Sequence, residues 1–349
     1  MMQNITKPPK GFRMPAEWES HASTWLSWPH NKDTWPMDGK YQAMIKQYCH
    51  LIGTLAQFEL VNINIGDIEL ENEAKQHLRD NGFSDLSNIK FHYFKTNDAW
   101  CRDHGPIFIT NERGEKAITN WQYNAWGGKY PPFDADNNIP QQISNLKHFP
   151  IFSPDIVMEG GSIEVNGKGT LMTTKACLLN KNRNPHLTQT DIEAYLMAFL
   201  GVKHIIWLED GIVGDDTDGH IDDLSRFVDA STIVTIVEED ETDANYVILK
   251  ENLETLHSLT DQDSKPFTIV TLPMPAPVYT NGERLPASYA NFLIANGCVL
   301  VPIFNDKNDQ KALDILQSCF ADRKVIGIPC RDIVWGLGTI HCMSQQEPL

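Results

Sequence analysis

Residues 190–208, TDIEAYLMAFLGVKHIIWL, predict a helix that is followed at once by a strand. Thr190 and Glu193 have the spacing of a capping box, and Gly201 is suited to end the helix. VKHIIWL at 202–208 is the strand. The apolar side chains that recur at helical spacing, and that we expect on one buried face, are Ile192, Tyr195, Leu196, Phe199 and Leu200.

Units of this kind recur along the chain. The other predicted helices, each given with the strand that follows it, are 40–57 with 58–66, 68–81 with 89–96, 244–258 with 267–273, and 308–319 with 324–330. These make about five helix-then-strand units, and Asn166-Gly167 supplies the turn of a further hairpin at 162–174. The alternation favours an α/β fold over an α+β or all-β fold. Neither usual nucleotide-binding glycine motif is complete.

The composition is that of an ordinary globular protein. The 349 residues include 29 Lys and Arg against 46 Asp and Glu, a formal net charge of −17. This charge disfavours nucleic acid or an anionic membrane as partner and suits a small cationic one. The length fits two domains or one large domain, and no linker divides it.

The seven cysteines are odd in number and scattered, without a C-x-x-C pair. This pattern argues against a zinc knuckle or a disulfide framework and indicates a reducing compartment. The N-terminus lacks the apolar core of a signal peptide, and no run of 18 apolar residues occurs. We therefore expect a cytoplasmic protein, and the sequence leaves a homo-oligomer open.

Four segments combine dense polar chemistry with glycines between predicted strands. They are 97–106 (NDAWCRDHGP), 158–162 (MEGGS), 214–223 (GDDTDGHIDD) and 336–348 (GLGTIHCMSQQEP). Loops at strand ends commonly carry functional sites.

Residues 209–223 hold seven acids and no Lys or Arg, which by itself is typical of a solvated acidic loop. His220 lies among these carboxylates, whose charge would raise its pKa and make it a proton donor near neutral pH. A divalent cation on His220, Asp218 and Asp222, with His341 completing the set, is the alternative. No standard metal-ligand spacing supports it, so we expect no metal.

Cys342 is the best candidate nucleophile, because it lies beside His341 in a polar loop. Cys101, inside NDAWCRDHGP, is the second candidate. Tryptophans are numerous near the polar segments and are usually core residues, but one beside an acidic pocket would suit a flat cation.

Several motifs occur together in a fixed order over nearly the whole chain, and as a set they resemble the agmatine deiminases. This family belongs to the guanidine-modifying superfamily of arginine and peptidylarginine deiminases and amidinotransferases. The sequence GLGTIHC departs from the family, whose members more often have Gly-Gly-Gly-Asn before the isoleucine. The motifs are GFRMPAEWESHASTWLSWPHN (11–31), W-x-R-D-x-G-P (100–106), NAWGGKYPPFDADN (124–137), EGGS (159–162), GDDTDGHIDD-x-x-RF (214–227), SYANFLIANG (288–297) and G-x-G-x-IHC-x-x-QQ-x-P (336–348).

The resemblance implies a five-bladed α/β propeller with a central site, formed by residues 1–349 as a single domain. It implies five catalytic residues, Asp103, Glu159, His220, Asp222 and Cys342, and no metal or organic cofactor. Asp103 and Asp222 would each bind N–H groups of a planar guanidinium. Cys342 would attack its carbon, and His220 would protonate the departing nitrogen and then activate water, while Glu159 holds His220 and the substrate.

The implied reaction converts agmatine to N-carbamoylputrescine and ammonia, so the expected partner is a small cationic guanidine. Asp215, Asp216 or Asp218 could bind the distal ammonium, and Asp216 and Trp100 are our predicted substrate-binding residues beside Asp103 and Asp222. A deiminase of arginine or peptidyl-arginine is the nearest alternative, although acids suit agmatine better than a substrate carboxylate.

Two other classes stay open. A metal-dependent amidohydrolase would use His220, Asp218 and His341. A polyamine-binding protein would use only the acidic pocket and the tryptophans.

Overall fold

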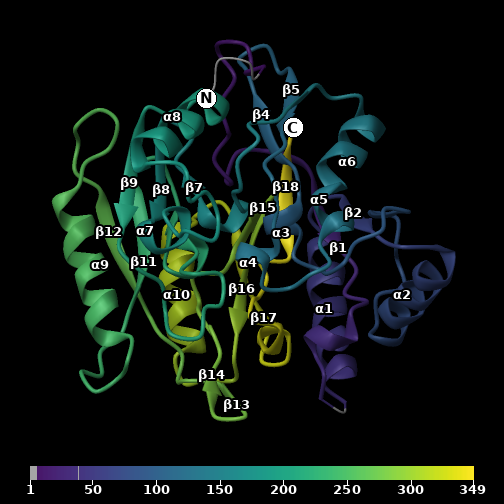
Figure 1. Cartoon of the computed structure of the whole chain (residues 1–349). Helices are drawn as coiled ribbons and strands as arrows, with labels where there is room; N and C mark the ends of the chain where they lie inside the picture. The colour runs from purple at the N-terminus through teal and green to yellow at the C-terminus, as the bar shows by residue number, and fades with distance from the viewer. Residues whose placement is uncertain (1–5, 38) are drawn as a thin grey trace.

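The computed structural model describes residues 6–37 and 39–349. Its strands lie toward the middle of the molecule, and long helices such as α1 (Lys40–Leu55) and α9 (Tyr246–Ser258) lie at the outside (Figure 1). The fold is therefore mixed α/β, as the alternation of patterns predicts.

Five of the sheets share one strand plan, in which the first strand pairs antiparallel with the second and the second pairs parallel with the third. Four of them are β4 (Ile107–Thr110), β5 (Lys116–Thr119) and β6 (Ile151–Phe152); β7 (Glu164–Val165), β8 (Thr170–Thr174) and β9 (His204–Leu208); β10 (Ser225–Phe227), β11 (Thr232–Val237) and β12 (Thr268–Pro273); and β15 (Leu293–Ala295), β16 (Cys298–Ile303) and β17 (Lys324–Pro329).

The fifth sheet joins the two ends of the chain. Its first strand is β18 (Ser344–Pro348), which pairs with β1 (His21–Ser27) so that Trp25 lies opposite Gln345. β2 (Val61–Asn64) and β3 (Ile89–His92) then continue the sheet in parallel. A separate ribbon of β13 (Tyr279–Thr280) and β14 (Glu283–Arg284) lies at the bottom of Figure 1.

Helices make the crossovers between parallel strands, as the connection requires. Besides α1 and α9, they are α2 (Ile68–Asp80), α6 (Ile139–Lys147), α8 (Gln189–Leu200) and α10 (Asp309–Cys319). Short helical turns occupy the loops: α3 (Cys101–His104), α4 (Ala125–Gly128), α5 (Asp134–Asn137), α7 (Lys175–Leu178) and the 3₁₀ turns η2 (Lys32–Thr34), η3 (Gly160–Ser162), η4 (Ile221–Asp223) and η5 (Ile333–Gly336).

The predicted units all form, but they do not correspond one to one to the five sheets. The units that contain α1 and α2 belong to the same sheet, and the unit of α6 and β6 was missed. The missed strand has two residues, and its helix is mostly polar. Ile139 and Ile143 do lie one helical turn apart and are buried, but a helix of nine residues followed by a strand of two is too short for its pattern to stand out.

Helix α8 confirms its predicted buried face, with the same five apolar residues buried. Gly201 ends it in the left-handed conformation, at φ 68°. The capping prediction is wrong by two residues, since Thr188 and Asp191 form the box while Thr190 lies inside the first turn. The hairpin turn is also confirmed, with Gly167 at φ 65° between β7 and β8.

All seven cysteines are free thiols. In the part of the chain that the structure describes, no helix combines the length and apolarity needed to span a bilayer.

Candidate active site

Each of the five sheets contributes one polar segment to a common cluster, and each segment directly precedes the first strand of its sheet. Their side chains are buried. The contributing residues are Asp103 before β4, Glu159 before β7, His220 and Asp222 before β10, Asn291 before β15, and Cys342 before β18. The repeated strand plan therefore brings residues from distant parts of the sequence together.

Asp103 lies on α3, and both of its oxygens are held. Oδ1 accepts a hydrogen bond from the backbone N–H of Gly161 at 3.0 Å, and Oδ2 accepts one from the indole of Trp126 at 2.9 Å. Its Oδ1 is 3.7 Å from Nδ1 of His220. Burial, together with the charge of Asp222, raises the pKa of Asp103 to about 6 although His220 opposes the rise.

Gly161 explains the glycine pair of MEGGS. A Cβ at this position would lie 2.7 Å from Nδ1 of His220, 2.8 Å from Oδ1 of Asp103 and 3.1 Å from Oδ2 of Asp222. Only a glycine leaves room for three functional side chains to approach one backbone position. Gly160 is required for another reason, because its Cβ would meet the carbonyl oxygen of Arg102 at 2.1 Å.

Glu159 is held from one side by Arg183, whose Nε donates to Oε1 at 2.7 Å. The same guanidinium donates to the Thr217 carbonyl at 2.9 Å and pairs with Asp218, so it ties Glu159 to the acidic loop. Oε2 of Glu159 and both ring nitrogens of His220 are buried without a hydrogen-bond partner among the described residues. Because unpaired buried polar groups are costly, these atoms indicate a place for a polar ligand.

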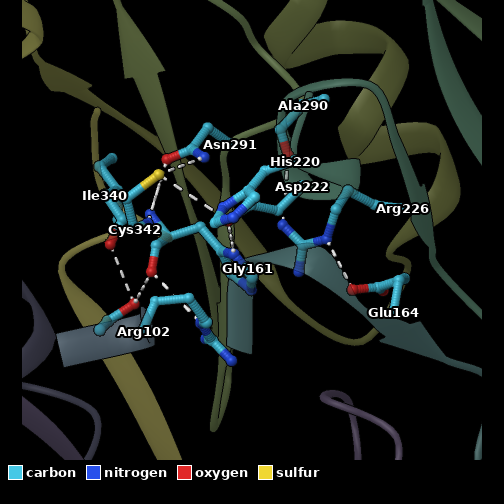
Figure 2. Close-up of polar contacts among 12 residues, drawn as sticks. Arg102, Gly161, Glu164, His220, Asp222, Arg226, Ala290, Asn291, Ile340 and Cys342 are labelled. Atoms are coloured by element: carbon cyan, nitrogen blue, oxygen red, sulfur yellow. Dashed lines mark hydrogen bonds and ion pairs between the residues drawn. The ribbon is translucent and has the colours of Figure 1, made fainter. Parts of the chain in front are cut away.

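The nucleophile candidate Cys342 lies beside Asn291 and Asp222. The amide of Asn291 donates to Sγ at 3.0 Å, and Sγ lies 3.8 Å from Oδ2 of Asp222. Figure 2 shows the sulfur beside Asn291 and facing the group formed by Asp222 and His220. Oδ1 of Asp222 has no partner within the described chain.

Burial and neighbouring charges shift the pKa values of both Cys342 and His220. Burial raises the pKa of the Cys342 thiol well above its ordinary value, and the charges of Asp222 and Asp223 add to the rise. Burial lowers the pKa of His220, but the charges of Asp103 and Glu159 and the contact with the Cys177 side chain together outweigh it and place that pKa well above its ordinary value. The site as it stands favours a neutral thiol and a protonated histidine, and a bound cation would shift the thiol toward thiolate.

The acids at 215–218 are already engaged. Asp215 accepts from the backbone N–H of Thr217 and of His220 at 2.8 and 2.9 Å, so it shapes the loop. Asp218 pairs with Arg183 and, at 3.0 Å, with Lys129. Asp216 contacts Lys129 at 3.3 Å, and its side chain remains 40% exposed.

Trp100 is almost fully buried and packs over the loop of the nucleophile. A Cβ on Gly338 would lie 2.5 Å from its ring and 3.0 Å from Cβ of Cys342. Its ring stacks on Trp35 with centroids 5.9 Å apart. Trp100 therefore forms a wall beside Cys342.

Cys101 lies in an apolar cluster with Trp25 and Phe108. Burial raises its pKa to about 12. Its sulfur receives a long hydrogen bond from the Asn64 amide at 3.9 Å, and its burial in this cluster makes Cys101 a core residue.

Three groups of described residues bring ligand atoms close enough to hold a metal ion. They are Glu159, Cys177 and His220; Glu17, Glu164 and His341; and Asp222, Asp223 and Cys342. The set His220, Asp218 and His341 is not among them. Asp218 is instead paired with two cations, which weakens the metal interpretation.

Asn291, Arg183 and Trp126 are site residues that no single segment of the sequence predicts. Asn291 and Trp126 do lie in quoted motifs, SYANFLIANG and NAWGGKYPPF. The repeated strand plan offers a signal for Asn291. Because each of the other four sheets has a polar segment just before its first strand, residues 288–291, which precede β15, would be expected to contribute to the site as well.

The buried cysteine, the histidine and the carboxylates together form a site that suits a cationic ligand and places a thiol beside it. The chain belongs to the Porphyromonas-type peptidyl-arginine deiminase family, whose model matches residues 13–348. This membership confirms that the ordered motifs mark a guanidine-modifying enzyme family.

Relatives within this family cover the whole chain. The agmatine deiminase of Pseudomonas syringae pv. tomato is 37% identical over 370 residues, which cover 99% of this chain and 98% of that protein. A structure of the agmatine deiminase of Enterococcus faecalis catalysing its reaction has a TM-score of 0.90, 33% identity and 98% coverage of both chains. A cysteine-to-serine variant of the C. jejuni agmatine deiminase with substrate bound has a TM-score of 0.86, 33% identity and 96% coverage of both chains.

Proposed function

We propose that this chain is an agmatine deiminase, which hydrolyses agmatine to N-carbamoylputrescine and ammonia. One observation carries the proposal: Cys342 Sγ lies within a buried cluster whose free polar atoms are oxygens of Glu159 and Asp222 and the two nitrogens of His220. Full-length similarity to enzymes named agmatine deiminases supports the substrate.

Binding of the guanidinium follows from the charges. The free oxygens of Asp222 and Glu159 can accept N–H groups of the planar fork, and each oxygen of Asp103 keeps one lone pair beyond its present bond. Every partner is buried, so water does not compete. The substrate charge in turn compensates carboxylates that would otherwise be costly to bury together.

The covalent step uses Cys342 and His220. The thiolate forms a bond to the guanidinium carbon, one C–N bond breaks, and His220 gives its proton to the departing nitrogen, which leaves as ammonia. Water then adds to the S-alkylthiouronium carbon while His220 takes one of its protons. The C–S bond breaks, which returns the thiolate. The second proton of the water leaves to solvent, where the released ammonia takes it up, and the neutral urea product is released.

Asn291 and Glu159 support this chemistry. The Asn291 amide donates to Sγ and therefore stabilises negative charge on it. Glu159, fixed by Arg183, offers its free oxygen to a substrate nitrogen or to His220.

Agmatine suits the surroundings better than arginine does. The cations near the acidic loop, Lys129 and Arg183, are already paired with Asp218 or Glu159. A substrate carboxylate would have to break these pairs, whereas an ammonium would share the partly exposed Asp216 with Lys129 and the Tyr130 hydroxyl. We keep Asp216 as the partner of the distal ammonium and Trp100 as the wall of the guanidinium pocket.

The architecture is part of the proposal. We propose that the five sheets are the blades of a propeller formed by residues 1–349 as one domain, with the site at its axis. Two observations support it: the shared strand plan, and the contribution of one site segment by each sheet. The free cysteines favour a reducing compartment, for which we propose the cytoplasm.

Ammonia release measured with agmatine, arginine and a peptidyl-arginine tests the function. We expect release with agmatine at a kcat/KM far above that of the other two. Turnover of arginine or peptidyl-arginine with none of agmatine would contradict the substrate but keep the chemistry. Activity that survives iodoacetamide but not chelation would contradict the cysteine mechanism.

A further inference from the structure

We propose that His341 is a positioning residue: clamped between Glu17 and Asp222, it keeps the Asp222 carboxylate ionised and oriented toward the guanidinium. The inference rests on the proposed function, because it requires a guanidinium substrate. It differs from that function in assigning work to a histidine and a glutamate that touch neither the substrate nor Sγ.

The two ring nitrogens of His341 each face a carboxylate. Nδ1 lies 2.7 Å from Oδ2 of Asp222, and Nε2 lies 2.8 Å from Oε2 of Glu17. A neutral imidazole has one N–H, and a carboxylate oxygen can only accept. With both carboxylates ionised, both contacts are satisfied as hydrogen bonds only when both ring nitrogens carry hydrogen, so the doubly protonated ring is the form that fits this geometry.

Glu17 is anchored firmly enough to serve as the fixed end of the clamp. Oε1 accepts from the backbone N–H of Ile294 at 2.6 Å, and Oε2 accepts from Arg226 at 2.6 Å. Burial favours a protonated Glu17, but the charges of Arg226 and His341 outweigh it and hold its pKa well below the ordinary value. In Figure 2 Arg226 is held in turn by Glu164 and the Ala290 carbonyl.

Asp222 needs this help because it is surrounded by acids. Burial raises its pKa, whereas the hydrogen bond and the charge of His341 lower it, and the lowering prevails. The charged and titratable groups that face it from the packed elements are the cations His220, His341, Arg226 and Arg102 and the acids Asp103, Asp215, Asp223 and Cys342. With Oδ2 held by His341, Oδ1 is the oxygen left for substrate.

The geometry also separates the roles of the two histidines. Both nitrogens of His341 are engaged by carboxylates, while neither nitrogen of His220 has a hydrogen-bond partner among the described residues, although its Nδ1 lies 3.7 Å from Oδ1 of Asp103. His341 therefore cannot exchange protons with substrate without breaking the clamp, and His220 can.

The experiment is the pH profile of kcat/KM for His341→Gln against wild type. Without the imidazolium the pKa of Asp222 rises, so Asp222 is protonated at low pH and regains its charge as the pH increases. The pKa of wild-type Asp222 lies below its ordinary value, so this carboxylate is ionised throughout the range from pH 5 to pH 9, whereas in the variant burial and the neighbouring acids oppose ionisation without the His341 contact. We expect the ratio of variant to wild-type kcat/KM to fall steadily as the pH is lowered from 9 to 5.

His341→Asn and Ser344→Ala are the matched variants. An Asn amide reaches about as far as Nδ1 and can still donate to Asp222, so we expect His341→Asn to retain more activity at pH 6 than His341→Gln. Ser344 donates to the His341 carbonyl in the same turn at 3.2 Å and does not contact Asp222. Ser344→Ala should show the wild-type profile.

A His341→Gln variant that is folded by circular dichroism and loses activity equally at all pH values would overturn the proposal. A His341→Gln variant with full activity at every pH would also overturn the proposal. If His341→Gln does not fold, Glu17→Gln, which frees the other end of the clamp, must show the same low-pH loss, and a wild-type profile there would overturn it. The assay uses whichever guanidine wild type turns over, so failure of the agmatine assignment is seen separately in the wild-type panel.

Discussion

Cys342 and Cys101 are both buried thiols with raised pKa values, yet only one is placed for chemistry. Cys342 has an amide donor at 3.0 Å and carboxylates that a cationic substrate would neutralise. Cys101 has the weaker contact of the Asn64 amide at 3.9 Å and packs in a cluster with apolar residues such as Trp25 and Phe108. At this scale, the neighbours of a side chain separate a nucleophile from a core residue.

Replacing Cys342 with Ser should lower kcat with agmatine by on the order of 10³-fold or more, because a neutral hydroxyl is a much weaker nucleophile than a thiolate. Quenched-flow mass spectrometry should find an adduct on wild type and none on the variant. The control Cys101→Ser should keep most activity per folded molecule. An equal loss in both variants would reject the assignment of Cys342.

Gly161→Ala should abolish turnover, while its free energy of unfolding should differ little from that of the control variant Gly66→Ala. The added Cβ would displace His220, Asp103 and Asp222, which are side chains rather than backbone. At Gly66, by contrast, a Cβ would meet only the end of the Leu70 side chain, at 3.3 Å. Activity and urea denaturation of both variants test this, and an active Gly161→Ala enzyme would show that the cluster can open.

At the scale of a single element, the start of α8 shows how local chemistry decides a boundary. TQTDIE contains two overlapping capping patterns, and the structure uses the first, with Asp191 accepting from the Thr188 N–H at 2.9 Å. Glu193 instead accepts from the Trp207 indole on β9 at 2.9 Å. A tertiary contact thus occupies the residue that the second pattern would have required.

Thr188→Ala should reduce the free energy of unfolding by about 1 kcal/mol, the usual cost of losing an N-cap side chain. Thr190→Ala, inside the first turn, should change it by less than about 0.5 kcal/mol. Chemical denaturation of the two variants measures the difference. A larger loss for Thr190→Ala would restore the second pattern as the cap.

At the scale of the whole molecule, Arg226 connects several sheets. From β10 it donates to Glu164 on β7 at 3.0 Å, to the Ala290 carbonyl before β15 at 3.1 Å, and to Glu17 before β1 at 2.6 Å. All these groups are buried. The sheets that supply the site are therefore held in position by the same charge network that anchors the His341 clamp.

Arg226→Met should destabilise the protein by on the order of 3–5 kcal/mol, since it leaves Glu17 and Glu164 buried without their cation. Arg13→Ala removes a half-exposed pair with Glu19 and should cost less than about 1 kcal/mol. Thermal and urea unfolding compare the two. Equal stabilities would mean that the two glutamates find other partners or protons.

The sequence by itself determined the residue types of the site and the elements with strong local patterns. The buried face of α8, the Asn166-Gly167 turn and the polar segments around Asp103, His220 and Cys342 follow from spacing and composition, which act over a few residues. The family resemblance rests on the same local motifs.

Only the tertiary structure decided which of these groups meet. β6 has two residues and exists because β5 pairs with it, and Asn291 reaches Sγ because the segments that precede β15 and β18 meet in the cluster. Glu17 and His341 are 324 positions apart in the chain and lie 2.8 Å from each other. Such contacts depend on the packing of sheets and on burial, which no local pattern encodes.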